Sequence, residues 1–549
     1  MSLLDWIVMI SVLLCIILYG IYKSRTTKNL EGYFLSNRSL PWFLVLMSIM
    51  GTQASAITFL TGPGQAYSDG MRFVQYYFGL PIAMIVISIF FVPVYKRLKV
   101  YTAYEFLQNR FDLKTRTFTS FLFLLSRGLS TGVSIYAPSL ILSSIMGWNI
   151  YYTNVVMGGV LIIYTMSGGA KAVAYTQVLQ MIIVFISLFL VGYIAVSLLP
   201  DNIGFSEAIA EADKLGKMNV ITTGITNGSF DWKDKYNIWS GLIGGFFLAL
   251  SYFGTDHSQV GRYLTAKSVS ESRKGLLMNG VVKVPMQFFI LLIGILIFSF
   301  YLYNKAPVYF DDTKVAAANK TVYKNDLQSL EQQYVNAVEA GHRDSAEVFR
   351  KSYKATLQKA LPGQDTNDNN YIFLRFVKDH LPVGLIGLLF AVIFLAAWGS
   401  IAAALNSLAA CTMVDFHKQF FVKDDSASNE YKISQWYTLG WGIFCIVIAM
   451  FAYNIGNSLI ETVNIIGSIF YGVILGIFLV AFWIKHIKGN AVFLSAIISE
   501  ILVIVVYMMD VVSFLWLNVI GALLVIAIGA LLQPFMPNQE GTKSLRHTK

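Results

Sequence analysis

Residues 48–64 interrupt an apolar segment that is otherwise long enough to cross a lipid bilayer. The stretch reads SIMGTQASAITFLTGPG, and its glycines, its polar side chains and its Gly-Pro-Gly ending all disfavour a continuous helix. Non-helical backbone at membrane depth is tolerated only where it is packed in protein or faces a wet cavity, because unpaired peptide groups are costly in hydrocarbon. We therefore predict a broken membrane helix with a binding site at the break, as is typical of secondary transporters. The alternative is an unbroken helix whose small residues serve close packing.

The composition places the chain in a membrane. Of its 549 residues 56% are hydrophobic and 13% are charged, and apolar runs of bilayer-spanning length recur throughout. We therefore expect an all-α polytopic membrane bundle and not a set of soluble domains. The three cysteines, Cys15, Cys411 and Cys445, fall in apolar segments and indicate neither a disulfide framework nor a metal site. The net charge of +10 fits basic cytoplasmic loops, and no nucleic-acid partner is expected.

About 13 transmembrane helices are predicted from the apolar runs. The first has almost no basic residue before it and no small-residue cleavage site after it, so we expect it to be retained and not removed as a signal peptide. The predicted spans are about 5–22, 41–61, 73–95, 117–146, 149–168, 175–199, 237–258, 276–303, 382–415, 433–454, 460–484, 490–509 and 512–534. An odd number of crossings places the two ends of the chain on opposite sides.

Basic residues gather in the loops on one side of these spans. They follow the first, third and seventh spans and recur in the C-terminal tail, whereas the intervening connections are nearly neutral or acidic. The residues are Arg25, Lys28 and Arg38; Lys96, Arg97, Lys99, Arg110, Lys114 and Arg116; Arg262, Lys267, Arg273 and Lys274; and Lys543, Arg546 and Lys549. Because basic loops stay in the cytoplasm, we expect the N-terminus outside, the C-terminus inside, and a multi-pass protein of the plasma or inner cell membrane.

A hydrophilic stretch at about 304–380 separates two of the spans. Within it, 325–331 and 346–353 carry apolar residues at steps of three and four, which predicts an external helical hairpin. The hairpin could be a lid over the transport path or a passive decoration. We favour the passive role, because no group of side chains in the sequence of this stretch converges chemically.

Two further segments could complete a site with residues 48–64. At 250–258 a glycine and adjacent polar and ionisable groups interrupt an apolar span, which predicts a second break. A later span carries small residues at i, i+3, i+4 and i+7, so that one helix face is smooth and bears a single hydroxyl. These residues are Ala396, Gly399, Ser400 and Ala403. Such a stripe is more often used for helix packing, but unwound carbonyls and a hydroxyl are also the oxygen ligands that hard cations prefer.

Four motifs follow one another along the chain: EGYFLSNRSLPW at 31–42, SAITF at 55–59, RYLTAKSVSE at 262–271 and ALNSLAA at 404–410. Together they resemble the sodium/solute symporter family, which includes sodium/glucose, iodide, monocarboxylate, proline and sialic acid transporters. The resemblance covers about residues 1–535 apart from the hydrophilic insert. It implies a leucine-transporter-like core of two inverted five-helix repeats with broken helices, alternating access, and sodium as the coupling ion without an organic cofactor.

The resemblance also divides the chain into parts. We expect the first membrane helix and its cytoplasmic connection at 1–40, the first repeat at 41–200, the second repeat at 237–303 and 382–484, an extracellular insert at 304–380, two C-terminal membrane helices at 485–534 and a cytoplasmic tail at 535–549. The expected partners are a small solute and membrane lipid, and the sequence leaves the oligomeric state open.

The family's principal sodium site falls, by resemblance, on the backbone of Gly51, Ala54 and Ala396 and on the side chains at 399 and 400. Ser400 matches the family, whereas Gly399 stands where members usually have a second hydroxyl. Other departures are Gln177 where an aspartate is common, Gln53 where some members have an aspartate, and Ala402 and Ala403 in place of hydroxyls that hold a second sodium ion. A second sodium ion is therefore not expected.

The family's solute-lining positions correspond here to Gln53, Thr58, Tyr76, Tyr77, Leu80, Ser130, Ala249, Tyr252, Lys283, Val463 and Asn464. Sugar-binding members place amides and a glutamate at several of these positions. Because Tyr77, Leu80, Ala249 and Val463 cannot replace those groups, the resemblance disfavours a glucose-type solute.

Two cations lie within predicted spans, Arg127 and Lys283. A charge there is expensive and usually faces the bundle interior, and a guanidinium matches the geometry of a carboxylate. One hypothesis is that Arg127, one turn before Ser130, binds an anionic solute such as a sugar acid. The alternative is internal pairing, for example Arg127 with Glu461 and Lys283 with Asp256.

Asp256 and His257 adjoin the second predicted break. They could form a proton-coupling pair or a pH-sensitive gate, because histidine titrates near neutral pH. We favour a simpler interpretation in which these residues lie in the inner vestibule.

Other classes of protein find less support. The sequence contains no His-Glu-x-x-His and no cysteine cluster, so we do not expect an enzyme. A proton-coupled or uncoupled carrier of the same fold remains an alternative to sodium symport. A channel is a weaker one, because sequence alone does not distinguish a pore from a carrier.

Overall fold

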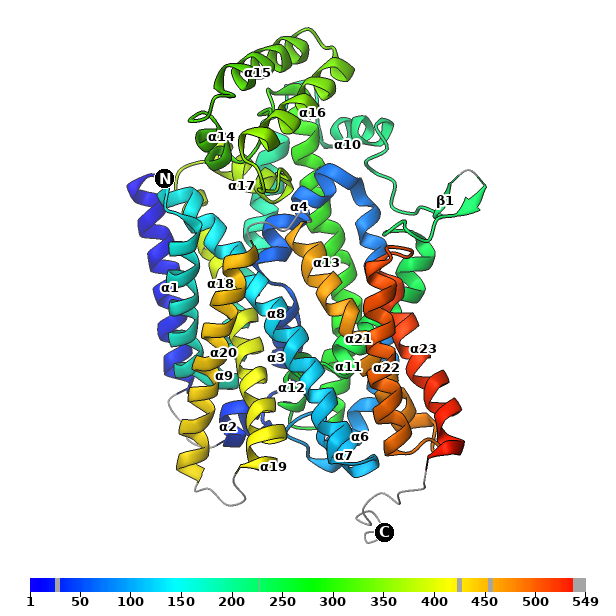
Figure 1. The fold of residues 1–549 in the computed structure, drawn as a ribbon. Coiled ribbons are helices and arrows are strands. Elements are labelled where there is room, and N and C mark those ends of the chain that lie inside the picture. Colours follow the sequence, from blue (N-terminus) through cyan, green and yellow to red (C-terminus); the bar gives the residue numbers. More distant parts are fainter. Residues whose placement is uncertain (25–29, 227, 422–426, 453–457, 537–549) are drawn as a thin grey trace.

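The helices form one bundle, shown in Figure 1. The computed structural model describes residues 1–549 except 25–29, 227, 422–426, 453–457 and 537–549. The helical insert α14–α17 lies at one end of the bundle, and the short helices α2, α7 and α19 lie at the other (Figure 1). We call these the insert end and the basic end. Helix α1 begins at the insert end and α23 finishes at the basic end, which agrees with an odd number of crossings.

The elements follow one another along the chain and are almost all helical. The first part contains α1 (Leu3–Ser24), α2 (Leu30–Leu35), η1 (Ser36–Arg38), α3 (Trp42–Gln53), α4 (Ala56–Asp69), η2 (Gly70–Tyr77), α5 (Leu80–Val86), η3 (Ile87–Phe91), α6 (Val92–Leu98), α7 (Glu105–Arg110), α8 (Leu113–Met146), α9 (Ile150–Ser197), α10 (Phe205–Lys214) and the two-stranded hairpin of β1 (Ile225–Thr226) and β2 (Ser229–Phe230). The second part contains η4 (Ser240–Gly244), α11 (Gly245–Gly254), α12 (His257–Leu264), α13 (Val269–Tyr303), α14 (Asp312–Ala318), α15 (Lys324–Glu339), α16 (Arg343–Ala360), α17 (Asn369–His380), α18 (Leu385–Cys411), η5 (Thr412–His417), α19 (Lys418–Phe420), α20 (Ala427–Phe451), α21 (Leu459–Trp483), α22 (Gly489–Met508), α23 (Phe514–Leu532) and η7 (Gln533–Phe535).

The membrane spans agree with the apolar runs of the sequence. Among the described residues, 10 helices are long and apolar enough to cross a bilayer, and three shorter apolar helices lie at Trp42–Gln53, Ile150–Met166 and Ser240–Gly254. The prediction of an all-α polytopic fold is therefore confirmed.

Helix α9 is two crossings joined by a sharp reversal. Its 48 residues would reach about 72 Å if straight, far more than a bilayer needs. However, the hydroxyls of Tyr164 and Thr176 lie 2.9 Å apart, whereas twelve residues of straight helix separate two positions by about 18 Å. The chain must therefore turn back between these two residues, as the separate spans at 149–168 and 175–199 predict.

The first predicted break exists, but it lies at Ala54–Ser55. Helix α3 ends at Gln53, and the amide of Ser55 donates to the Gln53 carbonyl, 3.1 Å away, in place of the usual helical acceptor four residues earlier, Gly51. The Gly-Pro-Gly sequence, by contrast, lies inside α4. A Cβ on Gly64 would stand 2.1 Å from the Asn369 carbonyl oxygen, so this glycine permits close backbone packing and does not end the helix.

The second predicted break is also present. Helix α11 ends at Gly254, and α12 begins at His257 after an extended Asp256. The carboxylate of Asp256 caps α12 by accepting hydrogen bonds from the backbone amide (2.7 Å) and the hydroxyl (2.6 Å) of Ser258. Two interrupted helices therefore face each other in the bundle.

The insert folds around a small hydrophobic cluster of its own. Helices α15 and α16 pack against each other as the predicted hairpin. The expectation that nothing converges in the insert is wrong, because Asp368 accepts hydrogen bonds from Lys354 (2.6 Å), Arg350 (3.4 Å) and the amide of Phe310 (3.0 Å). Sequence patterns missed this cluster because its members lie on separate segments.

Candidate functional site

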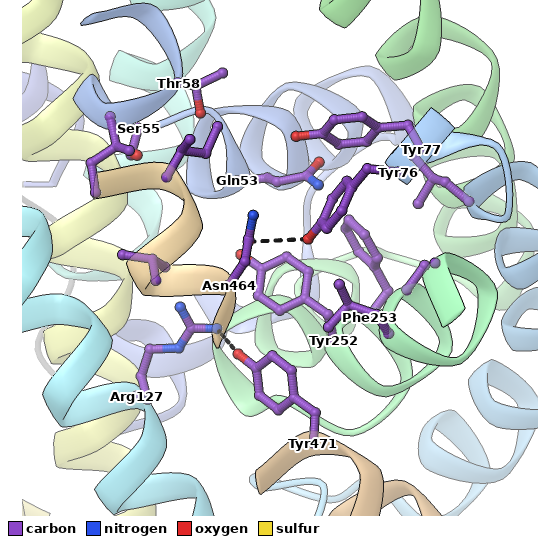
Figure 2. A pocket seen from close by; sticks show the side chains of 17 residues that line it. Gln53, Ser55, Thr58, Tyr76, Tyr77, Arg127, Tyr252, Phe253, Asn464 and Tyr471 are labelled. Atoms are coloured by element: carbon purple, nitrogen blue, oxygen red, sulfur yellow. Dashed lines mark hydrogen bonds between the residues drawn. The ribbon is translucent and has the colours of Figure 1, made fainter. Parts of the chain in front are cut away.

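A central cavity of about 100 Å³ lies between the two breaks (Figure 2). Its walls come from α3, α4, η2, α5, α8, α11 and α21. The lining residues are Gln53, Ser55, Ile57, Thr58, Tyr76, Tyr77, Leu80, Arg127, Gly245, Leu248, Ala249, Tyr252, Phe253, Ile460, Val463, Asn464 and Tyr471. Nine of the eleven solute-lining positions expected from the sequence are among them, as is Arg127, whereas Ser130 and Lys283 are not.

The upper part of the cavity in Figure 2 is a polar and aromatic surface. Tyr76 donates a 3.1 Å hydrogen bond to Asn464 Oδ1 and stacks on Phe73, which holds its ring in place. Gln53 is the last residue of α3, and its buried Oε1 has no hydrogen-bond partner within the described part of the chain. A buried amide oxygen without a partner is costly, so this atom would gain from a donor on a bound solute.

Arg127 reaches the cavity from α8 and is held on one edge. Its Nε donates to Asp256 Oδ2 at 3.1 Å, its Nη2 pairs with the same carboxylate, and Nη2 also donates to the Tyr471 hydroxyl at 2.8 Å. The guanidinium lies 5.2 Å from the centre of the Tyr252 ring. Its Nη1 bonds neither Asp256 nor Tyr471, and the Tyr252 hydroxyl is a further hydrogen-bond neighbour of the guanidinium. The guanidinium therefore keeps one donor edge for a ligand.

The internal pairing of Arg127 was predicted with the wrong partner. The acid is Asp256, whose side chain is fully buried, and not Glu461. The Tyr471 hydroxyl donates to the same Asp256 oxygen at 2.7 Å, so three groups from α8, α21 and the second break form one network. The interpretation of Asp256 as a vestibule acid is therefore wrong. His257 is equally buried, and the described residues offer no partner to its Nδ1.

The other two misplaced predictions, Lys283 and Ser130, have local explanations. Lys283 is fully buried on α13, makes no ion pair with Asp256, and places its Nζ 5.5 Å from the centre of the Tyr77 ring. It lies behind the cavity wall. Ser130 donates its hydroxyl to the Ser126 carbonyl at 2.8 Å, one turn back along α8. Both side chains lie away from the cavity, and their positions in the sequence did not indicate this.

The predicted sodium ligands lie where α3 packs against α18, and all of them are buried. Ser400 donates its proton to the carbonyls of Ala396 (3.0 Å) and Ala397 (3.1 Å), so the oxygen lone pairs stay available to a cation. Gln177 donates from Nε2 to the Gly399 carbonyl and to Thr52 Oγ1, each at 3.3 Å. No group of three or more His, Cys, Asp or Glu side chains converges among the described residues. The oxygen atoms available as ligands are thus carbonyls and one hydroxyl, which suit a hard cation.

A hydrogen-bond network around Glu461 lies on the insert side of the central cavity. This carboxylate accepts hydrogen bonds from Tyr236 (2.9 Å), Lys235 (3.1 Å) and Gln65 (3.5 Å). Gln65 lies seven residues beyond the cavity residue Thr58 on α4, about 10 Å further toward the insert end. The network therefore ties α4, α21 and the segment before α11 together on that side of the cavity.

Several cavity residues escaped the sequence analysis, most importantly Tyr471. It lies seven residues after Asn464 on α21, so the two share a helix face. This seven-residue spacing from Asn464 could have identified Tyr471 as a cavity residue from the sequence. Ser55 stands in the break itself and could have been chosen on the same ground as Gln53.

The chain matches the model of the Sodium:solute symporter family over residues 33–338 and 347–527. The chain belongs to this family. Its members are transporters and not enzymes, and the chain is accordingly a multi-pass, sodium-coupled symporter of small organic solutes. The predicted coupling ion and the predicted transport class are thereby confirmed, and the enzyme class is excluded.

Individual proteins are similar along almost the whole chain. The sodium/sialic acid symporter NanT of Aliivibrio fischeri is 24% identical over 97% of this chain and 94% of its own length. The sodium/sialic acid symporter SiaT of Proteus mirabilis is 25% identical over 98% and 96%. The sodium/glucose cotransporter of Vibrio parahaemolyticus is 26% identical over 90% and 83%.

A solved structure confirms the fold. A sodium-coupled sialic acid symporter, in a substrate-bound outward-open state, superimposes with a TM-score of 0.77 at 23% identity, covering 98% of each chain. The predicted leucine-transporter-like architecture with interrupted helices is therefore correct.

Proposed function

We propose that the transported solute is a small organic anion, such as a carboxylate or a sugar acid, and that Arg127 binds its carboxylate. The observation that carries this proposal is the half-used guanidinium: Asp256 and Tyr471 engage one edge, and Nη1, which neither of them binds, remains for a ligand beside the Tyr252 hydroxyl. Charge-assisted bonds from arginine to carboxylate are among the strongest hydrogen bonds in proteins. The similarity to proteins named sodium/sialic acid symporters supports the same class.

The remaining cavity surface suits a ring-bearing acid better than a neutral hexose. Tyr252 and Phe253 offer aromatic faces, and the unpartnered Gln53 Oε1 accepts a hydrogen bond from a solute hydroxyl or amide. Leu80 and Val463 offer no polar group. A hexose would leave most of its hydroxyls without partners against such a wall, and this mismatch lowers its affinity.

For sodium we propose a site formed by the carbonyls of Gly51, Ala54, Ala396 and Gly399 and the hydroxyl of Ser400. The hydrogen bond from the Ser55 amide to the Gln53 carbonyl supports this sodium site, because it leaves the Gly51 carbonyl without its usual helical donor. Sodium is cargo here, bound and released in each cycle. Gln177 must give up its contact with Gly399 or share that oxygen with the ion.

The two proposed sites share the break between α3 and α4. Side chains of Gln53 and Ser55 line the solute cavity, whereas the backbone of Gly51 and Ala54 serves the ion. Because Arg127 and Asp256 already neutralise each other, an arriving carboxylate adds one negative charge. Two opposite unit charges about 10 Å apart attract by about 1.7 kcal/mol at an effective dielectric constant of about 20, roughly a tenfold gain in affinity. Solute and sodium therefore favour each other's binding.

The membrane orientation is part of the proposal. Basic residues such as Lys96, Arg110 and Arg262 belong to the segments of the basic end. The positive-inside rule then places that end in the cytoplasm, the N-terminus and the insert outside, and the protein in the plasma or inner cell membrane among its lipids. The Glu461 network then lies on the outer side of the solute cavity.

A thermal-shift screen of purified protein tests solute class and ion together. Sialic acid, simple carboxylates, amino acids and glucose are added in sodium or in choline buffer, and stabilisation follows ligand concentration over dissociation constant. We expect sugar acids to raise the melting temperature in sodium and to do so far less in choline. Glucose should have no effect, and stabilisation by glucose alone would overturn the solute class.

Ser400→Ala tests the sodium site in the same screen. Loss of its hydroxyl should raise the sodium concentration needed for half-maximal stabilisation about tenfold, as expected for one lost ion ligand. Ser407→Ala is the matched control, because Ser407 is buried on the same helix and bonds the Ala403 carbonyl in the same way. Equal sodium dependence in both variants would place the ion elsewhere.

A further inference from the structure

A second cavity, of about 880 Å³, lies at the insert end between the membrane bundle and the insert. Residues from the outer ends of α4 and α13, from the segment after α10 and from the α15–α16 hairpin line this insert-end cavity. It is much larger than the central cavity and opens on a different face of α4 from the Gln65 contact with Glu461. The solute site described above does not include it.

Aromatic rings form one wall of the insert-end cavity. Tyr67 on α4 makes edge contacts with Phe298 at 5.4 Å and with Tyr301 at 6.2 Å, both on α13. Tyr334 on α15 adds a further ring. Flat apolar faces with hydroxyls at their edges are suited to ring-shaped ligands.

Positive charge gathers at the same cavity, and Lys217 places its Nζ 5.0 Å from the centre of the Phe298 ring. Lys217, Arg350, Lys351 and Lys354 line the cavity, against Asp344 and Glu347. Arg350 lies mostly buried and shares Asp368 with Lys354, so one carboxylate serves two cations. The cavity therefore retains positive charge after its internal pairs are counted, which favours an anion.

Two buried polar atoms at this cavity lack partners. They are the hydroxyl of Tyr301, a side chain that is 7% exposed, and the Nε of Arg350. Neither finds a hydrogen-bond partner within the described residues, and a buried donor left unpaired is costly. These two side chains must turn toward the cavity before a ligand with acceptor oxygens can satisfy both atoms.

The cavity also adjoins a segment that carries the central site. Lys217 fastens the outer end of α4 by donating to the carbonyls of Tyr67 (2.9 Å) and Ser68 (2.5 Å), and Ser68 in turn donates to Asn369 of α17 at 2.9 Å. The inner end of the same 14-residue helix, about 21 Å away, begins at the break that lines the solute cavity. A ligand at one end of α4 therefore acts on the helix that borders the other site.

We propose that the insert-end cavity is a second binding site, for a ring-bearing organic carboxylate, and that its occupant steadies the outer end of α4. The carboxylate meets Arg350 and Lys351, and the ring packs on Tyr67 and Tyr301. The occupant is either the transported solute or another carboxylate of the same chemistry. The choice of a sugar acid as a probe rests on the function proposed above.

Equilibrium binding of radiolabelled sialic acid to the full-length protein in nanodiscs tests this inference. The wild type should bind at two classes of site, and only the central class should require sodium in place of choline. Arg127→Ala should remove the central class and leave the other. The double variant Tyr301→Phe with Lys351→Gln should weaken the sodium-independent class at least tenfold. Lys359→Gln, an exposed lysine on the same helix outside the cavity, is the control and should change neither class.

The outcomes separate the two proposals. A single class that Arg127→Ala abolishes overturns the second site and leaves the proposed function standing. A single class that survives Arg127→Ala and falls in the double variant overturns the role of Arg127 and supports the second site. Where Arg127→Ala does not fold, Arg127→Lys takes its place. Competition by benzoate at the sodium-independent class alone identifies the occupant as a carboxylate other than the transported solute, whereas competition at both classes identifies the solute. Competition at neither class overturns recognition by a carboxylate and a ring.

Discussion

The two cavities each contain an arginine that a buried aspartate holds in place, but the two arginine–aspartate pairs differ in charge balance and in the helix at which the aspartate stands. In the central cavity Arg127 meets Asp256 alone, and the aspartate stands in the break between α11 and α12. In the insert-end cavity Asp368 serves both Arg350 and Lys354 and stands just before the unbroken α17. The first pair is electrically balanced, and its aspartate stands in an interrupted helix. The second group leaves one positive charge uncompensated, and its aspartate precedes an unbroken helix.

The charge balance explains what each pair can do. A balanced pair at a helix break can exchange its internal carboxylate for that of a solute as the helix halves move. For the insert-end pair, burial alone would raise the pKa of Asp368, but the charges of Arg350 and Lys354 outweigh it and hold that pKa below its ordinary value of 3.8. Asp368 therefore stays ionised at physiological pH and fixes its cations in one arrangement.

The largest effect is expected from Arg127→Ala. It removes the proposed solute anchor and leaves the buried Asp256 charge unpaired. The binding free energy of the solute should fall by about 3 kcal/mol or more, which is over 100-fold in affinity. Uptake of a labelled sugar acid by proteoliposomes measures it. Arg127→Lys keeps the charge but loses the planar fork and should recover only part of the uptake. Normal uptake in both variants would contradict the anchor role.

Asp368→Asn should come next in size. Because its pKa is lowered in the folded protein, the ionised Asp368 stabilises the insert above the unfolded pKa, and this stabilisation is lost as the pH falls through the folded pKa. At pH 7 the variant should lose about 3 kcal/mol of local stability, seen as faster hydrogen exchange in α16 and α17. The gap between variant and wild type should close below pH 3.8. A gap that is the same at every pH would show that the charge is not the cause.

Asp256→Asn is expected to have a smaller effect and the opposite sign. Asparagine can still cap α12, but it no longer competes with a solute carboxylate for Arg127. Solute affinity should rise about tenfold, and turnover should fall because release becomes slower. Binding and uptake assays on one preparation measure both. Weaker binding in this variant would mean that Asp256 helps to hold the solute.

Tyr471→Phe should give the smallest change. It removes the hydroxyl that joins Arg127 and Asp256 while keeping the ring, so about 1 kcal/mol and roughly fivefold in affinity should be lost. Tyr76→Phe is a matched control, since its hydroxyl bonds Asn464 and not the arginine. Solute titration in the thermal-shift assay compares the two. A larger loss for Tyr76→Phe would move the main solute contact to the Asn464 side of the cavity.

The sequence by itself determined the membrane spans, both helix breaks and the family. These follow from local properties, because bilayer thickness sets the length of an apolar run and glycine or polar residues weaken the helix where they occur. Even so, the Gly-Pro-Gly sequence marked the wrong position for the first break, since Gly64 makes room for the Asn369 backbone of another helix.

Only the tertiary structure decided which charges meet. Arg127 and Asp256 are 129 residues apart, and Tyr471 is 344 residues from Arg127, so no local pattern linked them. Glu461 was the expected partner of Arg127, yet it bonds Tyr236 and Lys235 instead. Lys283 and Ser130 lie outside the central cavity for the same reason. Helix periodicity gives the face of a residue on its own helix, whereas the packing of helices decides what that face meets.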